Sequence, residues 1–95
     1  MTYEVSYLPQ AEQDLIEILA YGIETWGENL AEGMYLKITD QLETLYFFPK
    51  RTKRRGSLGT REMLISHSPY RAIIQIDEEA KRVFILRILH TSRNI

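Results

Sequence analysis

Hydrophobic and polar residues follow one another along this chain in a pattern that predicts one sheet and two helices. Residues 3–7, Tyr-Glu-Val-Ser-Tyr, alternate large apolar and polar side chains, which is typical of a half-buried strand. Apolar residues then recur at helical spacing over about residues 9–25 and again over about residues 29–47. Gly27 separates the two helices, and Pro49 prevents the second from continuing. The short connection predicts an antiparallel helical hairpin.

Three further strands are predicted in the second half of the chain, at about residues 60–66, 70–76 and 82–90. Turn residues separate them, and such short connections require antiparallel neighbours. The last of these stretches is apolar except for Arg87, which is typical of a central strand covered on both faces. The order strand, helix, helix, strand, strand, strand predicts a single α+β domain over all 95 residues, with the hairpin packed on one face of a small, mainly antiparallel sheet.

Two helices can cover only one face of this sheet, so the other face is expected to be partly open. Because side chains alternate along a strand, one set on the last two strands is assigned to the helices. That set is Ala72, Ile74, Ile76, Phe84, Leu86 and Ile88. The opposite face then carries Arg87 and Arg61 among apolar residues. An open apolar face with arginines is a candidate partner site, since a guanidinium there is costly unless it meets water or an anion.

The net charge of −1 conceals a strong asymmetry along the chain. Residues 1–46 contain nine acids and one base, whereas residues 47–95 contain eleven bases and four acids. Five of these bases lie within residues 50–55, at the start of a glycine-punctuated loop that precedes the sheet strands. Such a cluster is either a solvated surface or a contact for nucleic acid or an acidic partner. Attraction between the two halves within the fold is the simpler alternative.

Composition also disfavours several classes of function. The chain has no cysteine, so it has no disulfide framework and no thiolate metal site. Its two histidines are far apart in sequence, which disfavours zinc, and no metal or other cofactor is expected. No apolar run approaches the roughly 18 residues of a membrane span, and no signal peptide is recognised, so the expected location is the cytoplasm.

Five short stretches, spread over nearly the whole chain, carry a family resemblance. They are residues 8–15 (Leu-Pro-Gln-Ala-Glu-Gln-Asp-Leu), residues 21–35 around Trp26-Gly27, residues 59–62 (Gly-Thr-Arg-Glu), residues 68–71 (Ser-Pro-Tyr-Arg) and residues 85–93 (Ile-Leu-Arg-Ile-Leu-His-Thr-Ser-Arg). In this order and spacing the chain resembles the RelE/ParE superfamily of toxins from type II toxin–antitoxin modules, which include plasmid stabilization systems. The hairpin turn and the Gly-Thr-Arg-Glu stretch are closer to ParE members.

The resemblance implies a cytoplasmic bacterial toxin that forms a hetero-oligomer with its cognate antitoxin. The C-terminal segment of the antitoxin would wrap the toxin and lie across the helical hairpin and the open sheet face. Met34, Tyr35 and Phe48 are the expected antitoxin contacts, although all three also fit a reading as core residues.

The superfamily offers two mechanisms. ParE-like members poison DNA gyrase and need only a binding surface, whereas RelE-like members are mRNA interferases that cleave messenger RNA on the ribosome. A nuclease would use Arg61 and Arg87 to clamp the phosphate and His90 as the acid or base. RelE-like enzymes often end in a catalytic tyrosine, which the last residues of this chain lack. Gyrase poisoning is therefore the favoured hypothesis, and a non-toxic binding or corepressor protein is a third. The expected target contacts are Lys50, Lys53, Arg54, Arg61, Arg71, Arg87 and Arg93.

Overall fold

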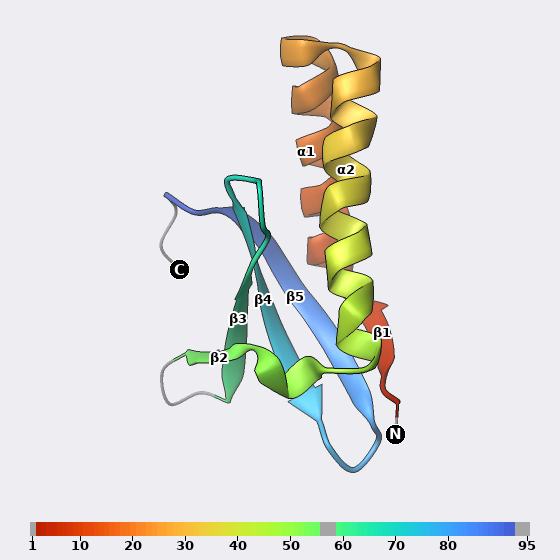
Figure 1. The fold of residues 1–95 in the computed structure, drawn as a ribbon, viewed down its shortest axis with the longest axis vertical. Coiled ribbons are helices and arrows are strands. Elements are labelled where there is room, and N and C mark those ends of the chain that lie inside the picture. Colours follow the sequence, from red (N-terminus) through yellow and green to blue (C-terminus); the bar gives the residue numbers. More distant parts are fainter. Residues whose placement is uncertain (1, 56–58, 93–95) are drawn as a thin grey trace.

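A helical hairpin lies on one side of a five-stranded sheet (Figure 1). The computed structural model describes residues 2–55 and 59–92. Its elements in chain order are β1 (Glu4–Tyr7), α1 (Pro9–Trp26), α2 (Glu28–Glu43), the 3-10 turns η1 (Thr44–Tyr46) and η2 (Pro49–Arg51), β2 (Lys53–Arg55), β3 (Thr60–Leu64), β4 (Tyr70–Asp77) and β5 (Arg82–His90). The predicted α+β fold is confirmed.

The strand order in the sheet is β1-β5-β4-β3-β2. β1 runs parallel to β5, while every other neighbouring pair is antiparallel. β2 is an addition to the predicted strands, because it lies inside the segment that we expected to be a basic loop. Its three residues pair with β3, with Lys53 opposite Glu62 and Arg54 opposite Arg61. Three of the five clustered bases thus form an edge strand of the sheet, and the other two lie in η2.

Gly27 joins the two helices, as the sequence predicts. It ends α1 and begins α2 with a φ of 91°, a left-handed conformation that favours glycine. The helices also approach closely further along the hairpin, where a Cβ added to Gly22 would lie 3.0 Å from the Cβ of Ala31. The end of the hairpin where α1 passes into α2 projects past the sheet (Figure 1).

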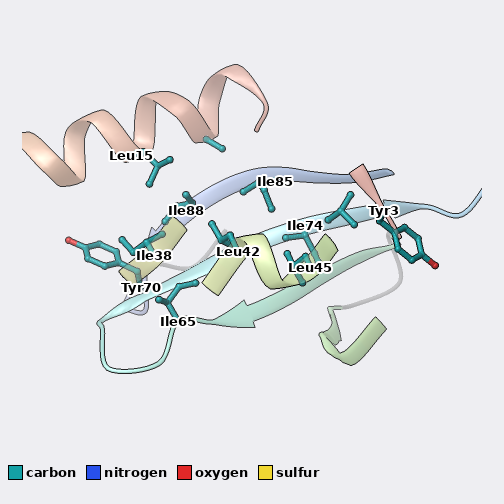
Figure 2. Close-up of a cluster of buried hydrophobic side chains, with 13 residues drawn as sticks. Tyr3, Leu15, Ile38, Leu42, Leu45, Ile65, Tyr70, Ile74, Ile85 and Ile88 are labelled. Carbon is teal, nitrogen blue, oxygen red and sulfur yellow. The ribbon is translucent and has the colours of Figure 1, made fainter. Parts of the chain in front are cut away.

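The hydrophobic core lies between the hairpin and the sheet (Figure 2). Ala11 and Leu15 of α1 and Ile38 and Leu42 of α2 pack there. The sheet contributes Tyr70, Ala72, Ile74, Val83, Ile85 and Ile88, and Ile76 packs against them. The predicted helix-facing positions of β4 are therefore correct. On β5, however, Ile88 alone was assigned correctly, because Val83 and Ile85 are fully buried in the core while Phe84 and Leu86 are half-buried.

A β-bulge explains this error. Ile73 lies opposite Arg87 and Ile74 lies opposite Ile85, so Leu86 is an extra residue in β5. An extra residue reverses the alternation of side chains from that point onwards. If side chains are assumed to alternate strictly along β5, starting from Ile88 and counting towards the start of the strand, the first half of β5 is assigned to the wrong face. Arg61 was misplaced too, because it lies opposite Ile74 and hence on the helix-facing side.

Candidate functional site

Arg87 is bound to a carboxylate of the protein itself. Its Nε donates a hydrogen bond to Oδ2 of Asp14 at 2.8 Å, and its terminal nitrogen donates to Oδ1 at 3.1 Å. Asp14 lies on α1 and is buried, while the Arg87 side chain retains 31% of its exposure. The expectation that Arg87 lies on a face that nothing in the chain covers is therefore wrong.

Asp14 can reach Arg87 and the backbone of β5 because β1 is short. This strand ends with Tyr7 opposite Ile85, so the next part of β5 has no strand beside it on that edge. Asp14 takes the place of a strand there, because its Oδ2 also accepts a hydrogen bond from the backbone N–H of Ile88 at 2.9 Å. Burial opposes ionisation of Asp14, but the hydrogen bonds from Arg87 and Ile88 outweigh it and lower the pKa of the carboxyl.

A cleft of about 420 Å³ opens beside this ion pair, between α1 and the end of β5. Its wall includes Glu17, Tyr21, Tyr70 and the exposed side chain of His90. The His90 ring meets the Tyr70 ring edge-on with centroids 5.7 Å apart, and its Nδ1 accepts a hydrogen bond from the backbone N–H of Ser92 at 3.2 Å. Of the two carboxylates in its wall, Asp14 is paired with Arg87 and Glu17 is exposed, and the negative charge of Glu17 does not favour a phosphate there.

A second hollow, of about 480 Å³, lies where η2, β2 and β3 meet the turn between β4 and β5. Lys50, Arg54 and Arg61 line it together with Thr60 and Glu78. One terminal nitrogen of Arg61 donates to the backbone oxygens of Thr52 at 2.8 Å and Lys50 at 3.3 Å. We call this hollow the basic cleft.

The three residues expected to form a nuclease site are thus not gathered around one point. Arg61 lines the basic cleft and His90 lines the cleft beside α1. Their partners on β4 are Ile74 and Tyr70, four residues and therefore about 13 Å apart along that strand. Arg87 lies near the cleft of His90, because it binds Asp14, which lines that cleft. The structure brings together Arg61 with Lys50 and Arg54, which the sequence also proposed as target contacts.

The remaining predicted residues are dispersed. Arg71 is 7% exposed and forms an ion pair with Glu62 on the adjacent strand, so it is not an open surface residue. Lys53 is exposed on β2, and Arg93 lies outside the described residues. Met34 and Tyr35 are half-buried against the core, whereas Phe48 is 66% exposed. Phe48 follows Tyr46 and Phe47, which are also exposed, and the three rings contact one another in sequence.

Two acidic residues were missed as parts of these sites. Asp14 lies three residues after Ala11 and four before Ile18, so helical spacing alone places it on the buried face of α1. That spacing could have identified it as the partner of a buried arginine. The sequence pattern places Glu78 only in a turn, yet its carboxylate binds Lys50, Lys81 and the hydroxyl of Tyr3. Nothing in the local sequence around Glu78 indicates those contacts.

Residues 2–55 and 59–92 contain no cluster of three or more metal-binding side chains in a suitable arrangement. Within the same ranges, no helix has the length and apolar character needed to cross a membrane.

Several solved structures of toxin–antitoxin systems share this fold. The chain matches a chain of the chromosomal ParDE system from P. aeruginosa with a TM-score of 0.85 and 20% identity, covering 94% of this chain and 96% of that one. It also matches the RelBE2 toxin–antitoxin complex from Mycobacterium tuberculosis with a TM-score of 0.67 and 23% identity, covering 95% of this chain and 99% of that one. The match to the intact RelBE complex from E. coli has a TM-score of 0.56 and 20% identity, covering 96% of this chain and 99% of that one. These matches show that the chain has the fold of these RelE and ParE toxins.

The family follows from the sequence match. The family model described as "ParE toxin of type II toxin-antitoxin system, parDE" matches residues 5–95, so the chain belongs to the ParE toxin family. No curated protein matches the chain in a direct sequence comparison.

Proposed function

We propose that this ParE-family toxin arrests growth by binding and poisoning DNA gyrase, and that it does not cut RNA. The observation that carries this proposal is the placement of Arg61 and His90 in separate clefts. Cleavage of RNA requires cations and an acid–base group around one phosphate. A poison requires only a surface that its target recognises.

The exposed bases of η2 and β2 are our candidates for target contacts. Lys50, Lys53 and Arg54 are all exposed; Lys53 and Arg54 belong to the edge strand β2, and Lys50 belongs to η2 just before it. By contrast, Arg71 and Arg87 hold carboxylates of the protein itself. We therefore assign these two arginines to supporting the fold, so that their replacement would lower toxicity through stability.

The cognate antitoxin is the proposed neutralising partner, and we propose that toxin and antitoxin meet in the cytoplasm, where gyrase is found. Relatives with this fold have been crystallised as toxin–antitoxin complexes. Phe47 and Phe48 are 58% and 66% exposed, which is unusual for two adjacent aromatic residues on a monomer surface. We propose that they form part of the antitoxin-binding surface.

Two purified assays test the mechanism. The toxin is added to gyrase with supercoiled and relaxed DNA, and separately to translating ribosomes with a defined messenger RNA. We expect inhibited supercoiling and trapped, cleaved DNA in the first assay, and intact RNA in the second. The variant Lys50→Gln/Lys53→Gln/Arg54→Gln should lose gyrase inhibition, whereas His90→Gln should keep it. RNA cleavage that disappears in His90→Gln would instead identify a nuclease.

A further inference from the structure

The cleft beside α1 contains a buried tyrosine whose hydroxyl has no partner. Tyr70 is 7% exposed, and its ring meets that of His90 with centroids 5.7 Å apart. Within the described residues, the Tyr70 hydroxyl forms no hydrogen bond. Figure 2 shows this hydroxyl directed away from the neighbouring core side chains, and Tyr70 lines the cleft. Because buried polar groups are normally hydrogen-bonded, this hydroxyl is available to a ligand in the cleft.

The charged groups of the cleft favour a cation. Asp14 is paired with Arg87, so the charges of these two groups offset each other. Glu17, on the same helix, is exposed. The hydrogen bond to Asp14 raises the pKa of Arg87, and the charge of Glu17 raises this pKa further, so Glu17 lies near the same guanidinium. Two carboxylates and one guanidinium leave one negative charge at the cleft.

The rest of the lining is apolar and aromatic. Ile88 and Leu89 are buried and Ile18 is half-buried, and all three line the cleft. Tyr21 is 56% exposed, and its ring meets that of Trp26 edge-on with centroids 5.9 Å apart. Apolar side chains suit an aliphatic stem, while an aromatic ring attracts a cation.

These features fit an organic cation better than a metal ion. Among residues 2–55 and 59–92 there is no cluster of three or more metal-binding side chains. A guanidinium is weakly hydrated and stacks on aromatic rings, so it loses little on leaving water for such a cleft. The volume of about 420 Å³ lies towards the lower end of small-molecule sites, which favours a short stem.

We propose that the cleft beside α1 binds an alkylguanidinium or alkylammonium group. The charge of this group pairs with Glu17, the hydroxyl of Tyr70 accepts a hydrogen bond from it, and its aliphatic stem lies against Ile18 and Leu89. The same chemistry occurs in free amines and guanidines and in the basic side chains of proteins. The site goes beyond the proposed action on gyrase and uses none of the bases proposed as target contacts.

Titration of the isotope-labelled toxin with n-butylguanidinium chloride, at pH 8 and constant ionic strength, tests the site. We expect saturable changes in the amide NMR signals of the cleft residues, with a dissociation constant of about a millimolar, as a ligand of this size allows. The neutral probe is n-butylurea, which has nearly the same shape but no charge. It should bind about fivefold more weakly, because it loses the attraction to the carboxylate and the rings.

Two variants test the assigned residues. Glu17→Gln should weaken binding of n-butylguanidinium about three- to fivefold. Its matched control is Glu24→Gln, which removes the same charge from the same helix, about 10 Å further along and outside the cleft. The control should change the affinity by less than about 1.5-fold, as expected for a screened charge. Tyr70→Phe keeps the ring but removes the hydroxyl, and should weaken binding about threefold.

A pentapeptide with capped ends and a central arginine distinguishes the two sources of the cation. Tighter binding of the peptide than of n-butylguanidinium identifies a side chain of a partner protein, whereas equal or weaker binding identifies a free amine or guanidine.

The proposal is overturned if the signals of the cleft do not saturate below about 20 mM ligand, or if n-butylurea binds as tightly as n-butylguanidinium. It is also overturned if Glu17→Gln and Glu24→Gln act alike, or if Tyr70→Phe binds as the wild type does. None of these measurements involves gyrase, so failure here is distinguishable from failure of the gyrase proposal.

Discussion

Asp14 and Arg87, 73 residues apart in sequence, form a doubly hydrogen-bonded ion pair at the edge of β5. The same carboxylate accepts the N–H of Ile88, so one side chain on α1 completes the hydrogen bonding of a strand that β1 leaves uncovered. The contact fixes the hairpin against the sheet close to the cleft that contains His90. Arg87 therefore has a structural role that accounts for its presence in an otherwise apolar strand.

Replacing Asp14 should destabilise the fold strongly. In Asp14→Asn the amide cannot satisfy both Arg87 and Ile88 as the carboxylate does, and Arg87 loses its counter-charge. Breaking one side of a buried ion pair costs about 3–5 kcal/mol, and the partial exposure of Arg87 reduces this to roughly 2–4 kcal/mol. Urea unfolding should show this loss in the free energy of unfolding. Glu12→Gln, an exposed change on the same helix, should stay within about 0.5 kcal/mol. Equal effects from the two variants would contradict the role given to Asp14.

The same carboxylate predicts a loss of stability in acid. Its pKa in the folded protein lies below its ordinary value, which is about 3.9 in an unfolded chain. Its contribution is therefore complete above about pH 5 and is lost as pH falls through the lowered folded pKa. The difference in unfolding free energy between the wild type and Asp14→Asn should shrink between about pH 5 and pH 2. Thermal melts of both proteins across this interval measure it, and a difference that is constant with pH would contradict the assignment.

Replacing Tyr7, unlike replacing Asp14, should stabilise the fold. Its hydroxyl is buried and has no hydrogen-bond partner among the described residues. Burial, with smaller effects from Glu43 and Tyr35, raises its pKa to about 12. An unsatisfied buried hydroxyl costs about 1–3 kcal/mol, so Tyr7→Phe should unfold at higher denaturant than the wild type.

Alkaline conditions extend the test of Tyr7. Because the folded pKa is raised above the unfolded value of about 10, the wild type should lose stability as pH rises from about 10 to 12. Tyr7→Phe should lose less over the same interval. A lower unfolding midpoint for Tyr7→Phe at neutral pH would show that the hydroxyl has a partner in solution.

The fold could be predicted from the sequence because the signals for it are periodic and local. The apolar spacing of α1 and α2, Gly27 between them and the three C-terminal strands all follow from rules of short range. β2 was missed because its residues are all basic, and it becomes a strand only through its pairing with β3. Tertiary pairing of this kind overrides local composition.

The candidate site was less predictable because it depends on two features that periodicity does not reveal. The bulge at Leu86 reverses the faces within β5, so the assumption of strict alternation exchanged core and surface positions. The acceptor of Arg87 lies on the first helix, 73 residues away, and a sequence does not state such a pairing. Lys50 and Arg54 are predicted as candidates from the clustering of charge and Arg61 from its expected place on the open sheet face, and the structure places the three in one cleft.

Phe48 provides the last prediction, which concerns the antitoxin. Phe48 and Leu64 are both 66% exposed, so replacing either by serine removes similar apolar surface without opening the core. If the aromatic residues after η1 receive the antitoxin, Phe48→Ser should weaken binding of the cognate antitoxin by about tenfold or more, as expected for an aromatic anchor. Leu64→Ser should change it little, and both variants should melt within a few degrees of the wild type. Titration calorimetry with the purified antitoxin measures the affinities. Tight binding by Phe48→Ser together with weak binding by Leu64→Ser would move the antitoxin to the β3 side of the molecule.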